Sequence, residues 1–204
     1  MNTEDYARYV AFLKLHLSPP RLDHSIGVMR VMQELASIYS LDSDQATTAG
    51  LLHDAAKDLP TETQLALAEQ AQIKFSYPCE RHPVYLHAPV GAFVVSNKLG
   101  ITDSLVLDAI AFHSYSGHGE NFDTPLARCL RSADILAPVN DWKGMRRLKS
   151  IVYTGQLQEA ALLQSGWLIE YFREIGLPIH PTLDNNFCSL STQLQVNDSF
   201  FERW

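Results

Sequence analysis

The chain has 204 residues, of which 46% are hydrophobic and 19% charged, and its formal net charge is -7 at pH 7. This length and balance suit one globular domain, or one domain with an appendage. The negative charge argues against a broad footprint on DNA or RNA, which needs clustered Lys and Arg. A small anionic ligand remains possible if a metal ion supplies positive charge locally.

The cysteines and the N-terminus indicate a cellular compartment. Cys79, Cys129 and Cys188 are isolated, so neither a disulfide framework nor a paired CxxC zinc or redox motif is expected. The first residues, MNTEDYARYV, are acidic where a signal peptide is basic, and no apolar run approaches the roughly 18 residues of a membrane span. We therefore expect a soluble cytoplasmic protein with neither a membrane nor a nucleic-acid partner.

Segments of helical period, separated by caps and breakers, predict an all-α bundle of about eight to nine helices. Ala46, Ala49 and Gly50 share a face of the third helix, which is expected to run to about Lys57 and to approach a neighbour closely. Pro89 is expected as the first residue of the fifth helix. The expected helices, in chain order, cover residues 3–17, 21–40, 43–57, 61–73, 89–100, 103–113, 125–137, 144–153 and 156–175.

The domain organisation follows from the same caps and helix-breaking residues. Residues 1–176 are expected to form the helical core. Residues 177–204 are polar and interrupted by breakers, so they are expected to form a C-terminal surface wrap with little regular structure, completing the same domain.

Six polar residues are expected to face inward, each from a different helix or helix end apart from one adjacent pair. They are His24, His53, Asp54, His87, His113 and Asp134. A lone His on an apolar face is more often a hydrogen-bonded core residue than a ligand. Burying four His and two Asp without positive charge is costly, however, and a divalent cation removes that cost.

The residue types narrow both the metal and its chemistry. Mixed His and carboxylate ligands without Cys suit iron, manganese, cobalt, nickel or zinc, and disfavour an all-oxygen calcium site. A metal of this kind lowers the pKa of a bound water and offsets the charge of a phosphoryl group. The pattern therefore favours hydrolysis of a phosphate ester or anhydride.

The sequence order of His24, His53-Asp54 and Asp134 resembles the H...HD...D pattern of the HD superfamily of metal-dependent phosphohydrolases. Six segments narrow the resemblance to the bacterial YqeK-type symmetrical dinucleoside-tetraphosphatases, over roughly residues 5–190. They are RLDHSIGV (21–28), GLLHDAAKDLP (50–60), CERHPVYLHAPVGA (79–92), AFHSYSG (111–117), SADILAP (132–138) and GLPIHPTLDNN (176–186).

The resemblance implies a ligand set and a reaction. It implies that His24, His53, Asp54 and Asp134 hold an iron ion, with Asp54 able to bridge to a second. His87 and His113 would ligate the second metal or hydrogen-bond the substrate phosphates. The reaction implied is hydrolysis of diadenosine tetraphosphate to two ADP, by attack of a metal-bound hydroxide on a central phosphorus.

Further candidates surround this set, each with a simpler alternative. Lys57 lies four residues after His53 and is a candidate catalytic residue together with Asp54, because its ammonium could meet a phosphate; alternatively it is a solvated lysine at a helix end. Arg21 is a phosphate contact or a surface charge. The remaining substrate-binding candidates are His118, otherwise a loop histidine, and His180 and Thr182, otherwise part of a proline-rich turn.

Two departures from the family pattern bear on the substrate. Ala137 and Asn140 stand where the family usually has Glu and Arg, and HSYSG replaces the family's His-Thr-Thr-Gly. The Asn removes a bidentate phosphate donor. A metal or nucleotide sensor without turnover, an HD phosphohydrolase with another nucleotide substrate, or a structural protein with buried His and Asp networks are therefore alternatives. Apolar residues near the C-terminus, Phe200, Phe201 and Trp204, are expected to pack either on the same chain or on a partner, which allows a homodimer.

Overall fold

The structure is a computed structural model that describes residues 1–115, 122–138 and 144–201. Every regular element in these ranges is helical, which confirms the all-α class. Ten α-helices are present in the described part, one or two more than expected. They are α1 (Thr3–His16), α2 (Pro19–Ile38), α3 (Ser43–Leu52), α4 (Thr61–Gln70), α5 (Pro83–Leu99), α6 (Ser104–Phe112), α7 (Pro125–Leu136), α8 (Met145–Tyr153), α9 (Leu157–Glu174) and α10 (Pro181–Leu194), with short 3-10 helices η1 (Pro78–Arg81) and η2 (Asp198–Phe201).

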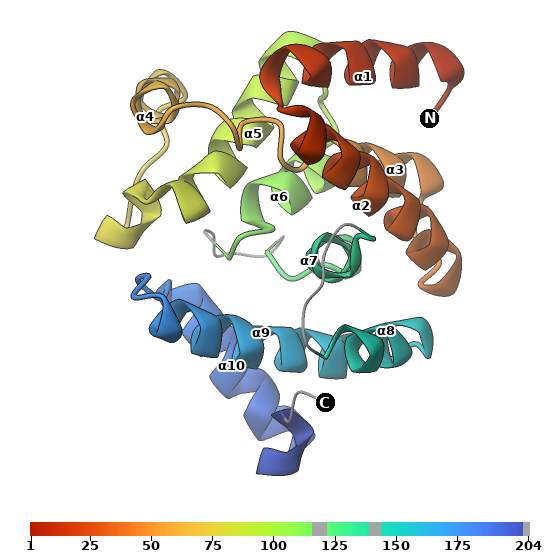
Figure 1. Cartoon of the computed structure of the whole chain (residues 1–204), viewed down its shortest axis with the longest axis vertical. Helices are drawn as coiled ribbons and strands as arrows, with labels where there is room; N and C mark the ends of the chain where they lie inside the picture. Colours follow the sequence, from red (N-terminus) through yellow and green to blue (C-terminus); the bar gives the residue numbers. More distant parts are fainter. Residues whose placement is uncertain (116–121, 139–143, 202–204) are drawn as a thin grey trace.

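Helix α7 is central to the packing. It contacts α2, α3 and α6 on one side and α8 and α9 on the other. In Figure 1, helices α1 to α6 lie above α7, and α8, α9 and α10 lie below it. The buried side chains Cys129, Leu130 and Ala133 of α7 belong to the cluster that joins α1–α3 with α8 and α9. Residues of α7 therefore lie between the N-terminal and C-terminal halves of the chain.

Helices α2 and α3 approach each other closely at Gly50. A Cβ placed on Gly50 would lie 2.9 Å from the Cα atom and 3.2 Å from the backbone nitrogen of Met29. Only a residue without a Cβ fits this contact. The close approach expected from the small residues of the third helix is thus made with α2, the helix that carries His24.

The third helix ends earlier than the sequence pattern predicted. Helix α3 stops at Leu52, and residues 53–59 form tight turns in which Ala55 N–H donates to the carbonyl of Leu52 and Lys57 N–H to that of Asp54. These bonds span three residues, as in a 3-10 turn. His53, Asp54 and Lys57 therefore lie beyond the end of the helix.

The prediction that a helix begins at Pro89 was also wrong. Helix α5 begins at Pro83, because His82 caps it: the His82 Nδ1 accepts from the backbone N–H of Val84. Pro89 lies inside the helix and has no N–H to donate to the carbonyl of Tyr85. The hydroxyl of Ser114 donates to that carbonyl instead, at 3.4 Å.

The segment after residue 177 is more regular than predicted. Helix α10 packs on α9 through Leu183, Phe187 and Leu190. Its start carries a proline at the first helical position and a cap, since the Nδ1 of His180 accepts from the N–H of Thr182. An apolar face of helical period thus lies within a segment whose overall composition is polar. No helix in the described ranges has the length and apolar character needed to cross a membrane.

Candidate metal centre

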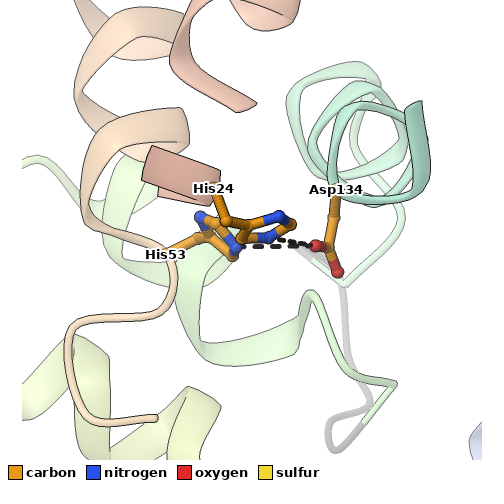
Figure 2. A group of neighbouring side chains, drawn as sticks. All are labelled: His24, His53 and Asp134. Atoms are coloured by element: carbon orange, nitrogen blue, oxygen red, sulfur yellow. Dashed lines mark hydrogen bonds and ion pairs between the residues drawn. The ribbon is translucent and has the colours of Figure 1, made fainter. Parts of the chain in front are cut away.

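His24, His53 and Asp134 bring their polar atoms together from α2, the end of α3 and α7 (Figure 2). The Oδ1 of Asp134 lies 2.9 Å from the Nε2 of His24 and 3.6 Å from the Nε2 of His53. The Oδ2 of Asp54 lies 3.6 Å from the Nε2 of His53 and 4.0 Å from that of His24. Two imidazole nitrogens and two carboxylate oxygens thus converge on one point, and we call this the first donor set.

The other oxygen of Asp54 faces a second group of donors. Its Oδ1 lies 3.2 Å from the Nε2 of His87 and 3.6 Å from the Nε2 of His113, and these two nitrogens are 3.1 Å apart. The Nζ of Lys57 lies 3.8 Å from the same oxygen and 3.1 Å from the Nε2 of His87. We call His87, His113 and Asp54 Oδ1 the second donor set; the carboxylate of Asp54 is shared by both.

Backbone carbonyls orient three of the four imidazoles. The Nδ1 atoms of His53, His87 and His113 lie 2.8–2.9 Å from the carbonyl oxygens of residues 50, 83 and 110. A carbonyl can only accept, so each Nδ1 carries the proton and donates it. In the neutral ring, Nε2 then presents its lone pair to the site, which is the arrangement that second-shell hydrogen bonds give to metal-binding histidines.

Two buried atoms of the site lack a hydrogen-bond partner among the described residues: the Nε2 of His53 and the Oδ1 of Asp54. Buried polar atoms are nearly always paired, because an unpaired one loses its hydration without compensation. The lone pairs of Asp54 Oδ1 and of the Nε2 atoms of His87 and His113 also face one another and repel. Divalent cations bound at the donor sets would satisfy these atoms, so the residues present fit a metal.

The charges of the site are those that ligands need. Burial would raise the pKa of Asp54, but Lys57 and the neighbouring imidazoles outweigh it and hold that pKa well below its usual range. Burial opposes the ionised form of Asp134 as well, yet the hydrogen bond from His24 and the nearby imidazole of His53 lower its pKa. Both carboxylates are thus ionised at neutral pH.

The two imidazoles with shifted pKa values differ in direction. Burial first, and Lys57 second, lower the pKa of His87 to about 4, which keeps the ring neutral near pH 7. This agrees with the contact to Lys57, because an ammonium can only donate and requires the Nε2 lone pair of His87. Burial also disfavours the charged form of His53, but Asp54 and Asp134 outweigh it and raise its pKa. The protonated form of His53 is stabilised mainly by those carboxylates, and the hydrogen bond to the carbonyl of Gly50 adds to their effect. A cation would take up the charge of the carboxylates.

A cavity of about 220 Å³ opens beside both donor sets. Its walls come from α2, the turn after α3, α5, the end of α6, α7 and α9. Charged and polar side chains line it together with apolar ones from α5 and α9. The lining residues are Arg21, His24, Asp54, Lys57, Val84, His87, His113, Ser114, Tyr115, Arg131, Asp134, Ile135, Gln164, Leu168, Tyr171 and Phe172.

The structure places most of the candidate residues at this cavity. All six inward-facing residues are brought together. Arg21 also lies there, with its Nη1 3.2 Å from the Oδ2 of Asp54, and so does Lys57. His118 and Asn140 lie outside the described residues. Ala137 is buried and packs on α2, since a Cβ added to Gly27 of that helix would lie 3.6 Å from the Cβ of Ala137. Ala137 does not line the cavity.

His180 and Thr182 do not line the cavity. His180 is fully buried, and its Nε2 lies 3.0 Å from the Oε1 of Glu80. Because its Nδ1 accepts from the N–H of Thr182, the Nε2 carries the proton and donates to that carboxylate. Both ring nitrogens are therefore occupied in joining η1 to the start of α10, which leaves neither for a ligand. Neither His180 nor Thr182 is among the residues that line the cavity, so a contact of either with the nucleotide stays a prediction.

Several residues of α7 and α9 that line the cavity were not predicted from the sequence, among them Arg131, Leu168 and Phe172. Leu168 and Phe172 have the spacing of an ordinary apolar helix face, which carries no signal of a cavity. Arg131 did carry a signal, because it is a charged residue one helical turn before Asp134 in a segment that otherwise reads as buried.

Comparison with known proteins agrees with this geometry. A family model described as HD domain matches residues 21–139. The symmetrical bis(5'-nucleosyl)-tetraphosphatase of Bacillus subtilis is 32% identical over 165 residues, 81% of this chain and 84% of that protein. The protein of the same name from Staphylococcus aureus is 31% identical over 156 residues, 75% of each chain.

A solved structure extends the agreement to the fold. It is a crystal structure from Clostridium acetobutylicum, described as a predicted HD superfamily hydrolase involved in NAD metabolism. It superposes with a TM-score of 0.83 at 28% identity, over 92% of this chain and 97% of the other. HD-domain membership implies a divalent metal ion, and the donor sets described above fit one. The chain therefore belongs to the HD-domain family, and it is one of that family's phosphohydrolases.

Proposed function

We propose that this protein hydrolyses diadenosine tetraphosphate, or a closely related dinucleoside polyphosphate, symmetrically to two nucleoside diphosphates. The observation that carries the proposal is the shared carboxylate of Asp54, which faces one donor set with each oxygen beside a cavity of about 220 Å³. The names of the Bacillus subtilis and Staphylococcus aureus relatives support the substrate.

The first donor set, His24, His53, Asp54 and Asp134, would hold one metal ion. His87 and His113, with the second oxygen of Asp54, would hold another ion or hydrogen-bond the substrate phosphates. Imidazole and carboxylate donors without thiolate suit iron, the metal that the YqeK-type resemblance implies, and also manganese, cobalt, nickel or zinc. When bound, such an ion supplies an acidified water and positive charge beside a phosphoryl group.

The protein's own cations would position the polyphosphate. Among the described residues, Arg21, Lys57 and Arg131 bring three cations to the cavity wall, where Asp54 and Asp134 are the carboxylates. Asp58 pairs with Arg21, and Asp123 pairs with Arg131. Lys57 is held between Asp54 and His87 with its side chain 29% exposed, so its ammonium can donate to a phosphate oxygen as well as to the imidazole. Donors fixed in this way stabilise charge that develops on the phosphoryl oxygens during reaction.

The apolar wall suits the nucleoside part of the substrate. Val84 of α5 and Leu168 and Phe172 of α9 line the same cavity as the charged residues. Ligand pockets of this kind combine an apolar wall with a few polar groups that set the orientation. A base and ribose against this wall would leave the phosphate chain directed toward the donor sets.

A product assay tests the proposal. Metal-loaded protein is incubated with diadenosine tetraphosphate, and the nucleotides are separated by chromatography. ADP as the only product is expected; ATP with AMP would mean asymmetric cleavage and would contradict the proposal. An Asp54→Asn variant is the control and is expected to form no ADP. Tight binding of the substrate by the wild type without any product would instead support the sensor hypothesis.

A further inference from the structure

Arg131 is a buried cation in the wall of the cavity that neither donor set uses. It lies on α7 one turn before Asp134, so the two residues are about 4.5 Å apart along the helix axis and share a face. Its exposure is 3%, yet its side chain lines the cavity. A charged side chain so deeply buried needs partners that offset the loss of its hydration.

The guanidinium of Arg131 is held rigidly. Its Nη1 donates to the carbonyl of Phe122 at 3.1 Å, and its Nη2 donates to the Oδ1 of Asp123 at 2.8 Å. The rings of Tyr115 and Phe122 each lie 4.8 Å from its central carbon. These contacts fix the group without using all five of its N–H donors, and its Nε is buried with no partner in the described ranges.

The charge of Arg131 is only partly balanced. Asp123 also accepts from Arg128, through the Nε of that residue at 2.8 Å and through its Nη2. Among the described residues, one carboxylate thus serves two guanidinium groups, and one positive charge is left over. Of the two arginines, only Arg131 lines the cavity, so the excess charge is available there to an anionic ligand.

We propose that Arg131 binds the substrate directly, by contacting a phosphate group adjacent to the one held at the donor sets. The inference rests on the proposed function and adds to it a residue that senses the length of the phosphate chain. On this proposal one phosphate occupies the donor sets, and the next phosphate of a diphosphate or longer chain meets Arg131. Arg131 therefore makes the site prefer nucleoside diphosphates and longer chains over monophosphates.

The test compares the affinities of ADP and AMP for metal-loaded protein by calorimetry. Arg131→Gln is expected to weaken ADP binding about 10- to 100-fold, the loss of a hydrogen bond to a charged group, and to leave AMP binding unchanged. Arg128→Gln is the matched control: it also removes a partner of Asp123, but it does not line the cavity, so the ratio of the two affinities should stay at the wild-type value. In either variant the other arginine keeps Asp123 paired.

A purely structural role predicts a different result. If Arg131 only holds α7 in place, its loss weakens ADP and AMP binding equally, and that outcome would overturn the inference. If Arg131→Gln does not fold, Arg131→Lys against Arg128→Lys carries the test. The lysine keeps the charge but loses the planar fork, so a partial loss of the ADP preference is expected only at position 131, and no loss there would refute the inference.

Turnover separates this inference from the proposed function. If the wild type forms ADP from diadenosine tetraphosphate but Arg131→Gln changes neither the nucleotide preference nor KM, the inference fails and the function stands. If the wild type forms no ADP from diadenosine tetraphosphate, but prefers ADP to AMP and the Arg131→Gln variant does not, the inference stands and the function fails. When both hold, the variant is expected to raise KM more than it lowers kcat, because the contact is made before and during the reaction.

Discussion

A methyl group added at Gly50 should destabilise the protein, whereas the same addition at Gly91 should not. At Gly50 the new Cβ would lie 2.9 Å from the Cα of Met29, and at Gly91 it would lie no closer than 3.6 Å to any atom. Both glycines lie within helices, where alanine is intrinsically better by about 1 kcal/mol. Gly91→Ala can gain that amount, since its contacts are of ordinary length.

The cost at Gly50 comes from the backbone of α2, which cannot rotate away as a side chain can. Overpacking in a core costs about 1–3 kcal/mol, and contact with two backbone atoms puts this site near the upper value. After the helix gain is subtracted, Gly50→Ala is expected to lower the free energy of unfolding by about 2 kcal/mol. The two variants should then differ by about 3 kcal/mol, or roughly 6–12 °C in Tm for a chain of this size.

Thermal unfolding followed by circular dichroism measures this difference, and metal analysis after dialysis measures its effect on the site. His24 lies on α2 and His53 directly after α3, so a separation of these helices should also reduce the retained metal in Gly50→Ala. The reasoning is refuted if Gly50→Ala melts at or above the temperature of Gly91→Ala. If Gly50→Ala melts lower but retains as much metal as the wild type, the stability argument holds and the expected effect on the metal site is refuted.

Three further predictions concern the metal, a cysteine and alkaline pH. Asp54→Asn should copurify with less than half the metal of the wild type by mass spectrometry, since each donor set loses an anionic oxygen; equal metal content would contradict the shared role. Cys188 is exposed and should react with a thiol reagent at pH 8, whereas Cys129 should react only after unfolding, because burial raises its pKa to about 12; rapid labelling of Cys129 would show the core to be wrong. Burial likewise raises the pKa of Tyr85 to about 12, which favours the neutral phenol in the folded state. Its contribution to stability should be present below pH 10 and be lost as the pH rises toward 12, so Tyr85→Phe should show a shallower loss in urea titrations across that range; identical slopes would exclude it.

The inward-facing polar residues could be predicted because helical period and buried polarity are both readable in a sequence. His24, His87, His113 and Asp134 each lie on an apolar helix face or at a helix end, and a polar residue there needs a partner. The identity of the partners comes from tertiary packing. Helical period alone could therefore collect the candidate ligands, and only the family resemblance divided them between two groups.

Other features were not predictable for specific physical reasons. Pro83 and Pro89 are both chemically suited to the first turn of a helix, and only the cap from His82 and the bond from Ser114 to the carbonyl of Tyr85 favour the earlier start. The apolar face of α9 serves partly as core and partly as cavity wall, and these uses require the same residue types. The overall polarity of the C-terminal segment hid the apolar face of α10, which needs only a few large side chains to pack on α9.

The early end of α3 explains how His53 and Asp54 can serve one site. Adjacent residues in a continuous α-helix point in different directions, so a helix running to Lys57 would turn one of the pair away. Because α3 stops at Leu52, the following tight turns let both side chains converge, with the Nε2 of His53 3.6 Å from the Oδ2 of Asp54. The same turns leave Lys57 3.8 Å from the other oxygen of Asp54. Substitutions that extended α3 through this segment would therefore disperse the site even if every ligand were kept, which makes the break in the helix as necessary to the metal centre as the residues themselves.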